Sequence, residues 1–391
     1  NASYRTYRKD SRVELRVDRD VLADAVTWAA KTIPSRPAIP VLAGIKLVAD
    51  SAGTLQVSAY DPETTALVET EASVDTSGEC LVNGRILAEI CRSLPGRPVD
   101  LKLDGTKLEL VCGSARFSLH SMALDEYPSL PSTDDVIGTV DGSEWLEAVT
   151  QVSSAASHDE TLPLLVSVCL EIDGENMTLM ATDRYRLAVR ELTWSPSKTD
   201  VSDRILVKAS RLLEIAKSYG SAGPITLALD EAGSAKMIGF DAVGRESTSR
   251  LIDGDYPQVR SLFQKDINGY AVVSRTDLLE AIKRSRIVVE RNSAVRLSFT
   301  EGQVTVEAGQ GGDSAQAKEV LQASLNGEDI TMAFNPSYLL DALTVTNAPY
   351  VRISFTHSTK PAVVSAQEEL GGDDSLDFRV LLMPIRAFGV N

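Results

Sequence analysis

The segment Leu212-Leu213-Glu214-Ile215-Ala216-Lys217 is one copy of a short pattern that recurs six times along the chain. Each copy has an apolar residue followed by leucine, usually then acidic or small residues and further apolar ones. The leucines shared by the copies are Leu22, Leu87, Leu146, Leu213, Leu279 and Leu340. From each of these leucines to the second one after it, the distance is 124 to 133 residues. The pattern therefore predicts three units of about 127 residues, each with two helices.

Short runs of alternating apolar and polar residues separate the predicted helices. Examples are residues 99–103, 107–112 and 295–299, which are bounded by Gly, Asp or Asn. A period of two between turn residues is typical of half-buried antiparallel strands. The predicted strands outnumber the helices by about four to one, so we expect an α+β fold in which helices cover one face of antiparallel sheets.

Polar residues ahead of the apolar periods indicate where the helices begin. A side-chain oxygen just before a helix can accept hydrogen bonds from its first free N–H groups. The expected caps are Asp18 or Asp20, Ser143, Ser210 and Thr276, and Asn335 precedes a proline at a first helical position.

The ends of the units also repeat. Tyr127-Pro128 and Tyr256-Pro257 each lead into a linker, and Met383-Pro384 follows at the same spacing. Because the third unit has no successor in the sequence, we expect its last strand to have free neighbours. The expected domains are residues 12–130, 136–262 and 266–391, after a disordered extension or cloning remnant at residues 1–11.

The composition gives little sign of catalysis. The net charge is −16, which disfavours a general nucleic-acid coat protein, and the apolar runs are far shorter than the ~20 residues of a membrane span. The sequence has no phosphate-binding loop, and residues 309–313 are predicted to form a flexible turn. We therefore predict no catalytic residue, no metal and no cofactor. The four cysteines have no paired spacing and are expected to be core thiols in a reducing cytosol, and the three histidines are expected at the surface.

Basic residues are concentrated in or beside the predicted helices, although the chain as a whole is acidic. For any single residue, an ordinary solvated helix face is the simpler interpretation. Taken together, they indicate a localised electropositive surface that contacts phosphates without reading bases. The residues are Arg19, Lys31, Arg36, Arg85, Arg92, Lys208, Arg211, Lys217, Lys283, Arg284 and Arg286.

Several longer motifs resemble one known family. They are Ser35-Arg-Pro-Ala-Ile-Pro-Val-Leu42, Ala181-Thr-Asp-Arg-Tyr-Arg-Leu-Ala-Val189, Asp253-Gly-Asp-Tyr-Pro257, Phe334-Asn-Pro-Ser-Tyr-Leu-Leu-Asp341 and Leu381-Leu-Met-Pro-Ile-Arg386. With these motifs in this order over residues 12–387, the chain resembles the bacterial DNA polymerase III beta subunit, the sliding clamp.

The resemblance implies a ring made of two copies joined head to tail, with six helices per chain lining the hole. It implies a closing contact between Phe117 and Leu119 of one copy and Ile287 and Val288 of the other. Arg36 matches a family position that touches DNA, and His158 lies near another. The expected DNA-contact residues are Arg36, Arg85, His158, Arg211, Lys217 and Lys283.

The resemblance also implies a hydrophobic cleft between the second and third domains that binds short peptide tails. Such clefts depend on apolar and aromatic anchors, and methionine adapts to varied ligands. The matching residues are Leu165, Thr182, Arg184, Tyr185, Arg186, Leu187, Pro257, Leu262, Asn335, Tyr338, Pro361, Leu381, Leu382, Met383, Pro384, Ile385 and Arg386. One departure is that Ala387-Phe388 follows Arg386 where many members have leucine, which bears on peptide preference.

The function implied is that of a non-enzymatic processivity factor in the cytoplasm, associated with the nucleoid and not with a membrane. Its expected partners are double-stranded DNA, the replicative polymerase alpha subunit, the clamp loader, and repair polymerases, ligase and mismatch-repair proteins. The alternatives are an α+β scaffold built of repeats, a specialised clamp paralogue, and a repeat-built enzyme of nucleotide metabolism.

Overall fold

The computed structural model describes residues 12–198, 200–221, 223–230, 236–263, 267–289, 293–309 and 315–385. Two compact units emerge, one of residues 1–139 and 222–250, the other of residues 140–221 and 251–391. The second sequence repeat therefore contributes strands to both units. The extension expected at residues 1–11 lies outside the described residues.

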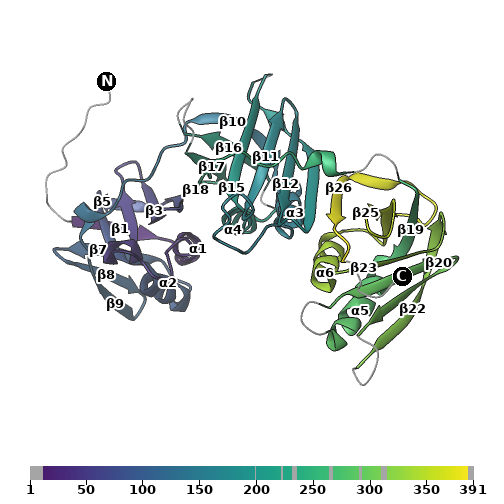
Figure 1. Ribbon diagram of the computed structural model, residues 1–391. Coiled ribbons are helices and arrows are strands. Elements are labelled where there is room, and N and C mark those ends of the chain that lie inside the picture. Colours follow the sequence, from purple (N-terminus) through teal and green to yellow (C-terminus); the bar gives the residue numbers. More distant parts are fainter. Residues whose placement is uncertain are drawn as a thin grey trace. The chain divides into compact units, whose positions relative to one another are not determined.

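The first repeat has nine strands and two α-helices in its described part (Figure 1). In chain order they are β1 (Arg12–Val17), α1 (Arg19–Ala30), β2 (Gly44–Ala49), β3 (Thr54–Asp61), β4 (Thr64–Glu71), β5 (Ser73–Thr76), β6 (Gly78–Asn83), α2 (Gly84–Ser93), β7 (Val99–Asp104), β8 (Lys107–Cys112) and β9 (Ala115–His120).

The second repeat has the same order of helices and strands, and its two-residue strand β14 stands in the place of β5. Its elements are β10 (Asp135–Asp141), α3 (Gly142–Ser153), β11 (Ser167–Asp173), β12 (Asn176–Thr182), β13 (Arg186–Thr193), β14 (Ser195–Pro196), β15 (Ser202–Lys208), α4 (Ala209–Tyr219), β16 (Pro224–Leu229), β17 (Met237–Ala242) and β18 (Arg245–Arg250).

The third repeat ends the described chain. Its elements are β19 (Gly269–Ser274), α5 (Arg275–Ser285), β20 (Val295–Thr300), β21 (Gln303–Ala308), β22 (Ala317–Asn326), β23 (Ile330–Phe334), α6 (Pro336–Val345), β24 (Tyr350–Phe355), β25 (Ala362–Gln367) and β26 (Asp374–Leu382); the short 3-10 turn η4 spans Arg286–Val288.

Each joint between repeats is a continuous antiparallel sheet. In the first unit β18 pairs with β4, so the second repeat extends the sheet of the first. In the second unit β13 pairs with β26 within the order β15-β11-β12-β13-β26-β25-β24-β19-β22-β21-β20-β23. These pairings explain why the second repeat is divided between the two units.

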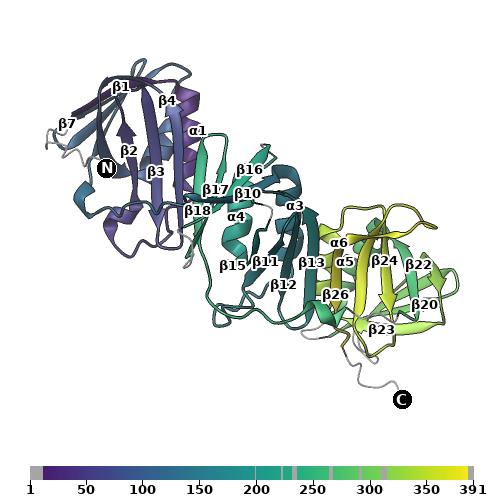
Figure 2. The ribbon, with the colours of Figure 1, turned by 90° about the horizontal axis from the view of Figure 1, so that it is seen from above.

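The α+β prediction is confirmed. The described residues form 26 strands and six α-helices, and the strand pairs that join the repeats are antiparallel. The helices α1 and α2, α3 and α4, and α5 and α6 pack in pairs against the sheets, as Figure 1 and Figure 2 show. None of the described helices is long and apolar enough to span a membrane.

The leucines shared by the six copies do not all occupy the same position in their helices. Leu22 and Leu87 are fully buried. In the other four helices the fully buried side chain is the preceding one, because it lies four residues after the cap, where the helix faces its sheet. These residues are Trp145, Leu212, Leu278 and Leu339.

Three of the predicted helix caps are wrong. Asp18 and Asn335 cap α1 and α6 as expected, the latter before a first-turn proline. The helices α3, α4 and α5 begin two residues earlier than predicted, at caps Asp141, Lys208 and Ser274. The reason is that each strand leads directly into its helix, so the last strand residue takes the cap position.

The last strand does not have free neighbours. Phe378–Leu382 pairs with β13 on one side, and β25 pairs with β26 on the other. The edge of β13 satisfies the backbone groups that the end of the third repeat would otherwise leave open. The Met383-Pro384 position is therefore part of a joint, and its side chains, not an open strand edge, must account for any binding.

Candidate docking cleft

A tight turn between β12 and β13 forms one side of the candidate cleft. The hydroxyl of Thr182 donates to the carbonyl oxygen of Arg186 at 2.6 Å. Asp183 Oδ1 accepts from the backbone N–H groups of Tyr185 and Arg186 at 3.0 and 3.1 Å. Arg184, at the tip, has a φ of 81°, a conformation that side chains rarely adopt and that this closed turn imposes.

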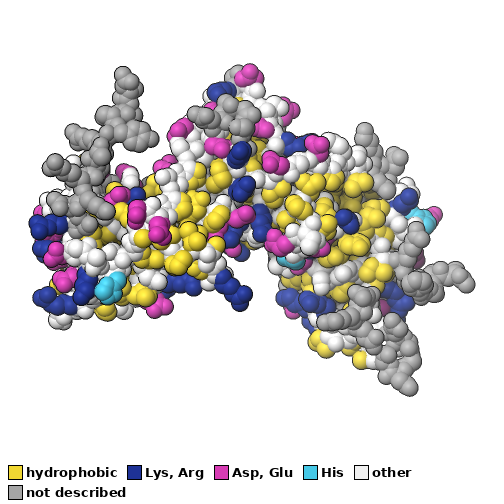
Figure 3. Space-filling view, turned by 60° about the vertical axis from the view of Figure 1, so that its left-hand side comes forward, with side chains coloured by type: hydrophobic (Ala, Val, Ile, Leu, Met, Phe, Trp, Pro, Cys, Tyr) yellow, Lys and Arg dark blue, Asp and Glu magenta, His cyan; other side chains and the backbone are white. Residues whose placement is uncertain are grey.

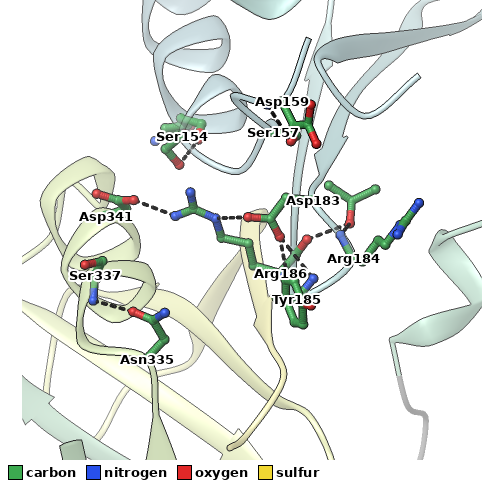
Figure 4. A network of polar contacts seen from close by, with 12 residues as sticks. Ser154, Ser157, Asp159, Asp183, Arg184, Tyr185, Arg186, Asn335, Ser337 and Asp341 are labelled. Atoms are coloured by element: carbon green, nitrogen blue, oxygen red, sulfur yellow. Dashed lines mark hydrogen bonds and ion pairs between the residues drawn. The ribbon is translucent and has the colours of Figure 1, made fainter. Parts of the chain in front are cut away.

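Arg186 is held inside this turn. Its side chain is only 6% exposed, and its Nε donates to Asp183 at 3.0 Å. A terminal nitrogen of the guanidinium donates to Asp341 of α6 at 2.5 Å. Figure 4 shows the guanidinium between the two carboxylates. A buried cation is tolerated where carboxylates surround it, so Arg186 fastens the second repeat to the third.

An aromatic wall adjoins this cation. The Tyr338 ring lies under the Arg186 guanidinium, with 4.3 Å from the guanidinium carbon to the ring centroid. Tyr338 also stacks with Tyr185 at a centroid separation of 6.3 Å. Desolvation raises the pKa of the Tyr338 phenol, so its ring is a neutral, partly buried surface.

Met383 extends this wall at the end of β26. Its backbone N–H donates to the carbonyl oxygen of Tyr185 at 2.9 Å, which fixes the chain beyond the strand. The side chains of Met383 and Tyr185 remain 43% and 60% exposed. Two large apolar side chains are thus held by a rigid backbone and left open to solvent, as a peptide-binding surface requires.

A shallow apolar hollow of about 10 Å³ lies at the same joint. Leu262 and Pro361 line it together with Leu381, and all three belong to the predicted cleft. Phe355 and Val363 also line it and were missed by sequence reasoning, because they belong to ordinary strand periods with no motif around them.

Several predicted cleft residues are buried and support the site without being exposed to solvent. Leu165, Leu187, Leu381 and Leu382 are buried. Leu187 and Leu381 join a core cluster with Tyr256, the residue before Pro257. Asn335 uses its side-chain oxygen to cap α6. Arg386 and the divergent residues 387–391 lie outside the described residues.

Two acidic residues of the site were not predicted. Asp183 and Asp341 orient Arg186, although neither was in the expected set. Both lie within the motifs 181–189 and 334–341, so the motifs themselves were the available signal.

The joint between β4 and β18 in the first unit has the same backbone hydrogen bonding as the β13–β26 joint, but different side chains. The carbonyl oxygen of Glu63 accepts from Arg250 N at 2.9 Å, as that of Tyr185 does from Met383. Where Leu187 faces Leu381, the first unit has Thr65 facing Thr248, joined at 2.6 Å by a hydroxyl hydrogen bond. Polar groups that bond to each other leave no apolar anchor site. Side-chain chemistry therefore distinguishes the two joints.

A much wider hollow lies elsewhere in the second unit. Its volume is about 1050 Å³, and charged and polar side chains form most of its lining. Arg260 and Arg204 in this lining form ion pairs with Glu191 and Glu171. We do not assign it as the cleft, because it lacks the exposed aromatic and apolar anchors that are found at the β13–β26 joint.

The predicted DNA-contact residues all belong to helices or to the loops beside them. Arg36 is exposed in the loop after α1, and Arg85 of α2 donates to Pro34 O at 3.0 Å, which places it beside that loop. Arg211 and Lys283 form ion pairs with Glu214 and Glu280 within their own helices. Lys217 and His158 are exposed. Figure 3 shows Lys and Arg side chains at several separate places on one face of the protein.

The predicted dimer contacts are unequal in exposure. In its sheet, β9 is an edge strand that pairs only with β8 among the described strands. Leu119 is only 8% exposed and belongs to the core of its own repeat, whereas Phe117 is partly exposed. Ile287, in η4, is 83% exposed, which is unusual for so large an aliphatic side chain.

The cysteines are free and buried. Burial raises the pKa of Cys80, Cys91 and Cys169 to about 12, so these thiols are poor nucleophiles. Within the described ranges, no group of three His, Cys, Asp or Glu side chains could hold a metal ion.

Most of the described chain matches known family models. Family models of the DNA polymerase III beta subunit match in three segments: the N-terminal domain at residues 13–131, the central domain at 139–258 and the C-terminal domain at 260–385.

Two curated relatives and one solved structure extend this comparison. The beta sliding clamp of Streptomyces coelicolor is 45% identical over 378 residues, which cover 96% of this chain and 100% of the relative. The beta sliding clamp homolog GriR of Streptomyces muensis is 40% identical over 96% of this chain and 99% of its own length. The crystal structure of the DNA polymerase sliding clamp from Bacillus subtilis matches with a TM-score of 0.88, covering 97% of this chain and 100% of that one. At 24% identity, this last match concerns the fold alone.

Proposed function

The chain belongs to the DNA polymerase III beta subunit family, and from this premise we propose that two copies close head to tail into a ring around duplex DNA. It is a DNA sliding clamp, a non-catalytic processivity factor of the replicative polymerase. The β9 edge and the exposed Ile287 support the proposed closure, because a ring covers both a free strand edge and an apolar side chain.

A closed ring stays on DNA by topology and needs no tight contact. Phosphate contacts by Lys and Arg are independent of sequence and weaken with salt, so they permit sliding. The proposed contacts are Arg36, Arg85, His158, Arg211, Lys217 and Lys283. The pairing of Arg211 and Lys283 with glutamates moderates their charge, which suits a surface that must slide. The net charge of −16 disfavours binding of DNA to the outside.

The second proposed activity is docking of partner proteins at the β13–β26 joint. Its main support is the exposed pair Tyr185 and Met383, held by a backbone hydrogen bond beside the Tyr338 ring. A peptide with aliphatic or aromatic residues would cover these side chains and gain affinity by burying them. The proposed partners are the polymerase alpha subunit, the clamp loader, repair polymerases, ligase and mismatch-repair proteins, all in the cytoplasm.

Reversing the charge of Arg36 is expected to slow loading of the clamp onto primed DNA. Arg36 is exposed in a loop, so Arg36→Glu should change the free energy of unfolding by less than about 0.5 kcal/mol. Replacing a cation with an anion at a phosphate contact should slow loading about tenfold at low salt, with a smaller effect at high salt.

The rate is measured with a clamp loader and fluorescent primed DNA. Arg296→Glu, in strand β20, is a control with the same charge change on a basic residue outside the proposed contacts. Equal loading rates for Arg36→Glu and the parent would remove Arg36 from the DNA-contact set.

A further inference from the structure

We propose that Asp341 is a positioning residue of the docking cleft, because it holds the Arg186 guanidinium over the Tyr338 ring and so fixes the aromatic wall. This inference rests on the proposed docking function of the β13–β26 joint. It assigns a role to a helix residue that is not expected to touch the peptide itself.

The first step is the orientation of Arg186. Asp183 binds Nε at 3.0 Å and belongs to the same turn, so it ties the guanidinium to its own strand. Asp341 binds a terminal nitrogen at 2.5 Å from α6, which belongs to the next repeat. With a carboxylate on each side, the planar guanidinium has one preferred orientation. With Asp341 removed, a buried terminal nitrogen loses its charged acceptor and the group can rotate away.

The second step leads from Arg186 to the aromatic wall. Tyr338 and Asp341 are three residues apart on α6, so both project from one side of the helix. The guanidinium lies 4.3 Å from the Tyr338 ring centroid, and that ring stacks with the exposed Tyr185. A cation over a ring face stabilises the position of the ring. Asp341 therefore acts on the cleft through Arg186 and Tyr338.

In α4 and α5, the acidic residue at the position that Asp341 has in α6 forms an ion pair within its own helix. Glu214 of α4 and Glu280 of α5 lie six residues after their caps, as Asp341 does in α6. Glu214 pairs with Arg211 and Glu280 with Lys283, each within its own helix. Asp24 of α1 and Glu147 of α3 lie at the same position and, like Asp341, contact another repeat, through Arg245 and Asn347. Because the Glu214 ion pair stays within its own helix, Glu214 is a matched control.

The binding experiment uses the full-length protein and a fluorescent peptide copied from the C-terminal tail of the polymerase alpha subunit of the same genome. Asp341→Ala should weaken peptide binding about tenfold, because the Arg186 guanidinium would no longer be held over the Tyr338 ring. Asp341→Glu should restore at least half of the lost affinity, and Glu214→Ala should change it less than about twofold.

A double-mutant cycle separates positioning from a general structural effect. In a Tyr338→Ala background, Asp341→Ala should weaken peptide binding by less than about twofold, because the ring through which it acts is gone. An equal loss of affinity in both backgrounds, or no loss in either, would overturn the proposal.

A second measurement decides the point without any peptide. In spectra of the tyrosine rings, Asp341→Ala should shift the Tyr338 and Tyr185 resonances, and Glu214→Ala should leave them in place. Unmoved tyrosine resonances in Asp341→Ala would overturn the proposal even if the clamp binds tails. If the unmodified protein binds no tail peptide, the docking function fails, and the ring shifts still test the positioning role.

Discussion

Replacing Ile287 with aspartate is expected to convert the clamp from a dimer to a monomer. Ile287 is 83% exposed in the single chain, and we propose that the partner copy covers it. Burying a carboxylate there without a partner costs several kcal/mol, on top of the lost apolar contact. The dimer dissociation constant should therefore rise by at least about a hundredfold.

Light scattering measures this directly. The parent should have twice the chain mass of 42.1 kDa, and Ile287→Asp should have the chain mass at micromolar concentration. Val243→Asp is a matched control, because Val243 is also a highly exposed β-branched residue but lies in the turn between β17 and β18. A dimeric Ile287→Asp protein would place the closing contact elsewhere.

Truncating Met383 is expected to abolish most tail-peptide binding while leaving the dimer intact. Its backbone N–H, not its side chain, makes the hydrogen bond to Tyr185, so Met383→Ala keeps the end of the strand in place. The lost apolar contact corresponds to about 1.5–3 kcal/mol, or roughly 10- to 100-fold in affinity. Deletion of residues 383–391 should have a larger effect, because it also removes that hydrogen bond.

Fluorescence anisotropy with the polymerase tail peptide gives the dissociation constants. Leu376→Ala is the control, since Leu376 is an exposed apolar residue at the other end of the same strand. An unchanged dissociation constant for Met383→Ala would show that the tail binds outside the β13–β26 joint.

The sequence pattern was enough to predict six helices and the α+β fold class, because helix and strand periods are local properties. It did not say which residue of each helix is buried, and in α1 and α2 that residue is the shared leucine, Leu22 or Leu87. Trp145 takes the same buried position in α3, one residue before the leucine that the pattern matched. A pattern of two adjacent apolar residues cannot distinguish which of them faces the sheet.

The joints between repeats could not be derived from periodicity. Pairing of β13 with β26 brings together residues almost 200 positions apart in the sequence. The alternation of apolar and polar residues shows which side of a strand faces the core, but not which other strand it pairs with. Arg186 illustrates the consequence for the site. The resemblance predicts Arg186 for the peptide cleft, and the structure shows its side chain 6% exposed and bonded to Asp183 and Asp341. No strand or helix period could have predicted the contact with Asp341, which lies 155 residues away.

The most direct test of the account is retention of the loaded clamp on DNA of different topology. The protein is loaded onto nicked circular DNA with a clamp loader, salt is raised to screen phosphate contacts, and half of the sample is linearised. A closed ring should remain on the circles and leave the linear molecules by sliding off their ends. Equal retention on circular and linear DNA would contradict the conclusion that the protein encircles the duplex.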